Sequence, residues 1–466
     1  MADNMRIEET LMVHGTMLIR LEAAAIRNER SFAEIRETLD GLVERLDVLN
    51  TNLANQSKPQ ITTNQPNNDS NTPGETEISR FNVKDVTVDE IAQVKNQQSV
   101  NNQNDQDLLI ECIAQPLGFS KGRPTAACII YKCLSHWRSF EASKTSIFDR
   151  IIQTIDHETE KQDDNNVLAY WLSTASTLLV LTQRQLEAKS PASLFKTQLS
   201  ASVENIYGMI RDDLKKEISP LLGLCIQAPR KSRENLLKGP TFALASAASQ
   251  DNLIAHWQEI VNKIECFLNM LKSNNVSPFL VRKLFTQIFY FINVELFKSI
   301  LLRRECCSLS NGEYVKAGLS ELEQWCYKAT EEYAGSAWDE LKHLRQAIGF
   351  LVIHEKSKKT LDEIIYDLCP VLSIQQIYRI STMYWDDKYG THSLHPDVIS
   401  KMRVLMTKDS NNAVGSSFLL DDDSSIPFSV DDLSKSMEQI NIADIEPPPP
   451  LCDNSGFSFL WSRAES

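Results

Sequence analysis

The stretch FLVRKLFTQIFYFINVELFKSILL (residues 279–302) is the most apolar run of the chain and decides its fold class. It is long enough to cross a bilayer as a helix. Arg282, Lys283, Glu295 and Lys298 interrupt it, which is typical of a buried core helix and not of a membrane span. The sequence therefore predicts a helical core around this stretch and no transmembrane segment.

Helical patterns continue on both sides of this run. Apolar residues recur at helical spacing through residues 107–408, and alternating strand patterns are scarce. Helix starts are marked by Ser277 before Pro278, which suits the first helical position, and by three capping-box pairs: Ser320 with Glu323, Thr360 with Glu363, and Ser373 with Gln376. We predict an all-α fold, an elongated bundle with two lobes.

Composition narrows the function classes. The 466 residues carry a net charge of -14, and 42% of them are hydrophobic. A protein that binds the phosphate backbone of a nucleic acid needs a basic face. Nucleic acid is therefore excluded as the main ligand. The ten cysteines contain no CxxC pair and lie mostly in apolar segments, where a reduced thiol acts as a small hydrophobe. This usage indicates a cytoplasmic protein.

A heptad seam precedes the helical region. Apolar positions alternate four and three residues apart through residues 7–53, as in a coiled coil. An amphipathic helix that lies on another protein is the alternative. Residues 54–106 are rich in Asn, Gln, Ser and Thr and predict a flexible linker. We expect a homodimer through residues 7–53, held mainly by the seam positions Phe32, Ile35, Leu39, Leu42, Leu46, Leu49 and Leu53.

The chain ends in an acidic, polar tail over residues 409–466. Ser429 and Asp432 predict the capped start of a short helix, whose apolar face should dock on the bundle. The run Asp421–Asp423 suggests solvated tail, and Ser424 and Ser425 beside it suit phosphorylation by an acid-directed kinase.

The search for catalytic motifs finds none. GFSKGRP (118–124) has the wrong spacing for a phosphate loop and predicts a turn before a helix. His392 and His395 lack further metal ligands nearby. In YWDDKYGTH (384–392), Asp386 and Asp387 should point to different sides of a helix end, so they form a poor acid/base pair. We expect no enzyme, no metal and no cofactor.

Several long segments carry a family resemblance, which covers about residues 107–466. ECIAQPLGFSKGRPTAACIIYKCLSHWRSFE (111–141), NIYGMIRDDLKKEISPLLGLCIQAPR (205–230), the segment 278–354 that includes the opening stretch, and LCPVLSIQQIYRISTMYWDDKYGTH (368–392) resemble the C-terminal globular tail of plant class XI myosins. The resemblance places the dilute domain at about residues 148–408. It implies a two-lobed helical tail that binds cargo receptors or adaptors on organelles or vesicles in actin-based transport, with Rab-type GTPases as further candidates.

The resemblance also suggests a partner surface. Aligned on LEQW (322–325), a Rab-contacting tyrosine, lysine and glutamine of class V tails fall at Ala317, Gly349 and Val352, so none is kept. The candidate partner residues are Glu313, Lys316, Ala317, Gly349, Val352, Tyr384, Trp385 and Tyr389. No motor head or IQ motif is found, so we expect a headless, cytoplasmic protein peripheral to organelles. A rearranged or fused gene product that folds without a dedicated transport role is the alternative.

Overall fold

The computed structural model of the chain describes much of the region after residue 102. All described residues belong to one compact unit, Val86–Ser466. The predicted coiled coil (1–53), most of the predicted linker (54–106) and His392 lie outside them. The described ranges are 103–141, 146–160, 164–185, 192–229, 254–390, 393–410, 418–437, 440–442 and 445–461.

The first lobe contains a helix over residues 103–113, which crosses the predicted boundary at 107. Two antiparallel strands of two residues each, β1 (Phe119–Ser120) and β2 (Arg123–Pro124), form a small hairpin. The hairpin leads into α3 (Thr125–His136), so GFSKGRP is indeed a turn before a helix. Gly118 and Gly122 have φ angles of 66° and 75°, which glycine adopts without strain. The lobe is completed by α4 (Ile147–Glu160) and α5 (Asn165–Gln185).

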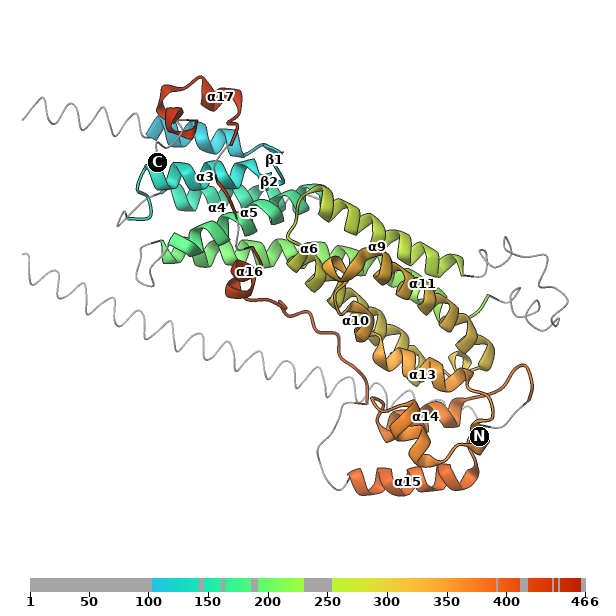
Figure 1. Ribbon diagram of the computed structural model, residues 1–466. Coiled ribbons are helices and arrows are strands. Elements are labelled where there is room, and N and C mark those ends of the chain that lie inside the picture. Colours follow the sequence, from blue (N-terminus) through green and yellow to red (C-terminus); the bar gives the residue numbers. More distant parts are fainter. Residues whose placement is uncertain are drawn as a thin grey trace, which may run out of the picture. The chain divides into compact units, whose positions relative to one another are not determined.

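One long helix joins the lobes. α6 (Ser193–Cys225) has 33 residues and is therefore about 50 Å long. Near its start, Phe195 stacks on Phe148 of α4 with ring centroids 4.4 Å apart. At its end, the Cys225 carbonyl accepts a hydrogen bond of 3.2 Å from the indole of Trp257 in α9 (Ala255–Ser273). Figure 1 shows α6 running between the two groups of helices.

The second lobe is built around the stretch that opened the sequence. α10 (Pro278–Leu302) packs against α6 and the later helices of this lobe. Among the described residues it is the one helix long and apolar enough to cross a membrane. Its large side chains are buried on several sides, including Phe285, Phe289 and Phe297, as expected for a core helix. The helices that follow α10 in chain order are α11 (Leu309–Tyr333), α12 (Ala337–Glu340), α13 (Lys342–Val352), α14 (Ile374–Met383) and α15 (Pro396–Ser410).

The predicted helix starts are mostly confirmed. The Ser373–Gln376 pair forms a complete capping box at α14, and Thr360 and Glu363 exchange the expected bonds before the π-helical turn Glu363–Leu368. The prediction at Ser320 is wrong, because Ser320 lies inside α11 and donates to the Lys316 carbonyl. The apolar face of α11 is buried on both sides of Ser320. This packing stabilises a continuous helix, although the Ser320–Glu323 pattern is typical of a helix start.

Short irregular turns connect these helices. The described part of the chain contains three 3₁₀ turns, at Arg304–Cys306, Lys356–Lys358 and Ser455–Leu460.

Each of the ten cysteines is a free thiol. Burial raises the pKa of several of them, for example that of Cys369 to about 12, which fits their role as small apolar side chains.

The acidic tail returns to the bundle. α16 (Val430–Ser436) starts at the predicted Ser429–Asp432 capping box and buries Leu433 completely. α17 (Pro449–Cys452) and the Ser455–Leu460 turn reach the first lobe, where Phe459 stacks on His136 at 3.7 Å. The expectation of solvated tail at Asp421–Asp423 is wrong in part. Tyr290 and Gln287 of α10 donate to backbone carbonyls of this run. Lys215 of α6 pairs with the Asp422 carboxylate, whose side chain is 27% exposed.

Candidate functional site

The predicted partner residues on α11 and α13 lie on neighbouring helices. Gly312 of α11 lets them approach, since a Cβ there would lie 3.0 Å from side-chain atoms of Leu351 and Val352. The end of α13 meets the start of α11, so the helices run antiparallel. Ala317 and Gly349 therefore lie within about one and a half turns of this contact.

The exposed part of this surface is chemically mixed and has small side chains at its centre. Lys316, Ala317 and Gly349 are exposed, while Glu313 and Val352 are half-buried. A Cβ added at Gly349 would meet nothing within 4 Å. The surface offers backbone and short side chains to a partner, and it lacks a clustered set of catalytic groups.

The loop 384–390 is fixed to α11. The Lys388 ammonium forms an ion pair with Glu313 of α11, and the Asp387 carboxylate accepts a 3.0 Å bond from the Ser310 backbone at the first turn of α11. The Asp386 carboxylate instead accepts from the backbone N–H groups of Lys388 and Tyr389. The two aspartate carboxylates thus point to different groups, as the sequence predicted. Both have structural roles.

The three aromatic residues of this loop divide between packing and exposure. Tyr384 is buried, and Trp385 is half-buried with its backbone N–H donating to the Cys307 carbonyl at 3.2 Å. Tyr389 is 66% exposed and lies edge-on to His354, with ring centroids 6.4 Å apart. We therefore keep Tyr389 as a candidate contact residue, whereas Tyr384 mainly packs.

Sequence reasoning missed Lys356, which lies beneath this loop. Its side chain is only 3% exposed, and its ammonium sits 4.0 Å from the Tyr384 ring centroid and donates to the Ile353 carbonyl at 2.7 Å. Burial lowers the pKa of Lys356 to about 8, partly offset by the Asp386 carboxylate. A lysine in a polar turn (EKSKK, 355–359) gives no signal of burial in the sequence alone.

Replacing Lys356 by methionine should give a pH-dependent gain in stability relative to the unmodified chain. The pKa of Lys356 is about 8 when folded and near 10.5 when unfolded. Below pH 8 both states are protonated, so the cost of burying the ammonium is fully present; above pH 8 the folded state loses the proton and that cost shrinks. We expect the advantage of methionine to fall by about 2 kcal/mol between pH 7 and pH 9.5.

Urea unfolding of both chains at the two pH values measures this change, and thiol ionisation cancels in the difference. Lys358→Met is the matched control, because Lys358 is exposed on the same turn and pairs with Glu355 at the surface. A stability difference for Lys356→Met that is independent of pH would contradict the burial argument.

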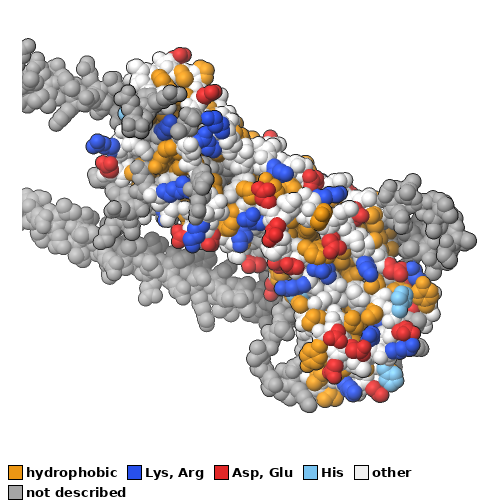
Figure 2. Space-filling model, viewed as in Figure 1, with side chains coloured by type: hydrophobic (Ala, Val, Ile, Leu, Met, Phe, Trp, Pro, Cys, Tyr) orange, Lys and Arg blue, Asp and Glu red, His pale blue; other side chains and the backbone are white. Residues whose placement is uncertain are grey.

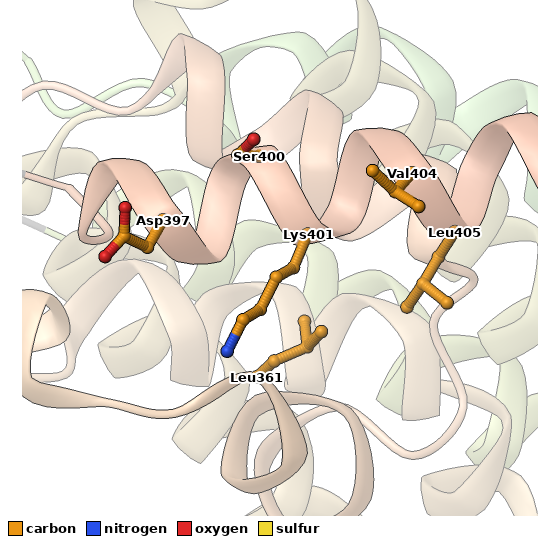
Figure 3. A pocket seen from close by; sticks show the side chains of 6 residues that line it. All are labelled: Leu361, Asp397, Ser400, Lys401, Val404 and Leu405. Carbon is orange, nitrogen blue, oxygen red and sulfur yellow. The ribbon is translucent and has the colours of Figure 1, made fainter.

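The open pocket beside α15 lies elsewhere in the second lobe. It has a volume of about 570 Å³ and is lined by Leu361, Asp397, Ser400, Lys401, Val404 and Leu405. In Figure 3 the side chain of Lys401 reaches from α15 toward Leu361. One carboxylate, one ammonium, one hydroxyl and apolar groups do not make a reactive site. Across the described residues, no three His, Cys, Asp or Glu side chains gather as metal ligands.

Known proteins are similar to this chain over the region that contains the candidate surface. The DIL domain family matches residues 283–388, which run from α10 to the loop 384–390. Myosin-11 of Arabidopsis thaliana is 65% identical over 418 residues, covering 78% of this chain, and Myosin-9 of the same plant is 64% identical over 427 residues, covering 80%. The chain spans only 27% and 28% of the lengths of these two relatives.

Solved structures share the fold at low sequence identity. The structure described as Myo2-GTD in complex with Mmr1 has a TM-score of 0.53 and 16% identity, and the alignment covers 76% of this chain and 93% of that one. A myosin V cargo binding domain has a TM-score of 0.52 and 16% identity, with 77% and 93% covered. The fold is thus that of a myosin globular tail. The C-terminal region of this chain is a globular tail of the plant class XI myosin type, as the sequence resemblance predicted. The DIL match itself covers residues 283–388 of the second lobe, a shorter range than the expected 148–408.

Proposed function

We propose that the chain binds cargo as a myosin globular tail, and that it engages receptors or adaptors on organelles or vesicles in actin-based transport. The observation that carries the proposal is the surface of α11 and α13 with Tyr389, which lies within or beside the matched DIL segment. Its small exposed residues and fixed loop suit a protein partner. A neighbour with the same fold is described in complex with Mmr1.

The protein would act in the cytoplasm, peripheral to the organelle. Figure 2 shows acidic and basic side chains interspersed over one face of the molecule, so recognition of a protein receptor fits better than adhesion to an anionic membrane. Rab-type GTPases are a further candidate class, although the family's contact tyrosine, lysine and glutamine are replaced by Ala317, Gly349 and Val352. We also propose that the chain is a homodimer through residues 7–53.

The double change Ala317→Arg and Gly349→Glu tests the surface. Both positions are exposed, so the fold should tolerate the longer side chains, while a partner that closes over the small residues should be excluded. We expect binding of the labelled chain to a plant organelle fraction to weaken by about tenfold or more, which corresponds to about 1.4 kcal/mol. Sedimentation of the organelles with bound protein measures the affinity.

The matched control is Ala201→Arg with Gly223→Glu, which makes the same two exchanges at exposed positions of α6. It should leave binding unchanged. An excess of the unlabelled Myosin-11 tail should displace the chain, and failure to do so would favour the rearranged gene product without a transport role. Equal binding by both double variants would place the contact on another surface.

A further inference from the structure

An extended segment of the acidic tail, residues 418–429, crosses the bundle, and we call it the strap. It starts near α14, where the Gln376 side chain donates to the Phe418 carbonyl at 3.0 Å. It ends at α16 in the first lobe, where Phe428 packs edge-on against Tyr207 with ring centroids 5.1 Å apart. Figure 1 shows it running alongside α10 between these ends.

The centre of the strap is bound as a peptide ligand would be. Four side chains, which we call the cradle, hold it: Arg211 and Lys215 from α6, and Gln287 and Tyr290 from α10. Arg211 donates to the Ser424 carbonyl at 2.7 Å, Gln287 to the Ser425 carbonyl at 2.7 Å, and Tyr290 to the Asp421 carbonyl at 3.2 Å. The Tyr207 hydroxyl donates to the Gln287 amide oxygen at 3.0 Å and so orients that amide.

Only one side chain of the strap takes part in this recognition. The Lys215 ammonium pairs with the Asp422 carboxylate at 2.7 Å. The remaining cradle bonds go to main-chain carbonyls, which every extended peptide presents. The cradle therefore selects an extended backbone with a carboxylate at one position, and it tolerates many sequences.

The electrostatics explain why the cradle should not stand empty. With the strap in place, Arg211 and Lys215 are 5% and 8% exposed. Arg211 has an ion pair with Asp212 of its own helix, which does not depend on the strap. Lys215 would lose the Asp422 carboxylate if the strap left, and removing the partner of a buried charge is costly. A second acidic segment would restore the same charge-assisted bonds, so exchange costs far less than simple opening. Residues 421–425 are polar and mostly exposed, apart from the paired side chain of Asp422, so little apolar burial holds the centre of the strap.

We propose that the cradle is a second interaction surface, occupied here by the chain's own strap, and that it accepts an extended acidic segment of a partner protein in exchange. This surface is separate from that of α11 and α13. A partner with a carboxylate at the place of Asp422 would displace the centre of the strap and bind α6 and α10 together. The strap then acts as an internal competitor that sets the affinity threshold for such partners.

A labelled peptide tests the exchange on the full chain. The probe is a fluorescein-labelled peptide with the sequence of residues 418–430, and its anisotropy reports binding. Asp422→Lys repels the strap from Lys215 and raises the fraction of open cradle; because apparent affinity scales with that fraction, we expect the peptide to bind this variant about tenfold tighter or more than the unmodified chain. A peptide with asparagine at the three aspartate positions should bind about tenfold more weakly.

Charge reversal at two neighbouring lysines of α6 tests whether the peptide binds at the cradle. In the Asp422→Lys background, Lys215→Glu should abolish binding of the acidic peptide, because the charge-swapped strap closes again. Lys216→Glu makes the same charge change at an exposed neighbour on α6 and should leave binding intact. Equal peptide affinity for the unmodified chain and Asp422→Lys, or equal loss with Lys216→Glu, would overturn the proposal. Because Asp422 is not part of the apolar core and the asparagine peptide alters no protein residue, both readouts survive if Lys215→Glu fails to fold.

Discussion

Replacing Gly318 by alanine should disrupt the packing of the second lobe, although the change adds one methyl group. A Cβ at Gly318 would lie 2.1 to 2.3 Å from the ring atoms of Trp257. The indole cannot move aside easily, because it is fully buried and bonded to the Cys225 carbonyl. Overpacking costs about 1–3 kcal/mol and can exceed that where the neighbours are fixed, so we expect a loss of about 3 kcal/mol or more.

Thermal unfolding measures this effect against a matched control. Gly349→Ala makes the same exchange in α13 at an open position, where alanine gains up to about 1 kcal/mol from helix propensity alone. The two variants should therefore differ in sign. If Gly318→Ala had the same melting temperature as the unmodified chain, α9 and α11 would not be in this close contact. Because Ala317 of the proposed partner surface directly precedes Gly318, the Gly318→Ala variant should also weaken partner binding.

The sequence predicts those parts of the fold that depend on local pattern. The apolar run at 279–302 identified the core helix α10, since a helix buried on several sides requires apolar residues over most of its length. Ser373 and Ser429 marked helix starts correctly, because capping is decided within four residues. Ser320 carried the same local signal and failed, because the buried faces on either side of it determine the helix.

The arrangement of the candidate surface depends on contacts that are distant in sequence. Glu313 and Lys388 pair across 75 residues, and no charge pattern along the chain indicates it. The closeness of α11 and α13 depends on Gly312, and that of α9 and α11 on Gly318. From the sequence alone, neither glycine can be told from an ordinary helix-weakening residue. The strap was missed for a related reason: an acidic, polar segment suggests solvent when its basic partners on α6 are not known to be adjacent.

Changing Leu39, Leu42 and Leu46 together to serine should produce the largest loss of organelle binding, by about 100-fold or more. The sequence places all three on the predicted seam of residues 7–53, and burying each leucine is worth about 1.5–3 kcal/mol. Removing three should exceed the stability of a short coiled coil, so the dimer should become a monomer. A flexible linker over residues 54–106 would let each tail reach about 40 Å, and a second tethered contact raises avidity by about 10²–10⁴.

The triple variant separates avidity from the contact itself. Light scattering should report half the mass, binding to organelles should fall, and the affinity of one tail for one isolated receptor should stay unchanged, because the globular region is not altered. Arg36, Val43 and Asp47 changed to serine form the matched control, since they lie off the seam and their exchange preserves the net charge. A monomer mass for the unmodified chain at micromolar concentration would contradict the dimer, and residues 7–53 would then be an amphipathic segment that docks on another protein.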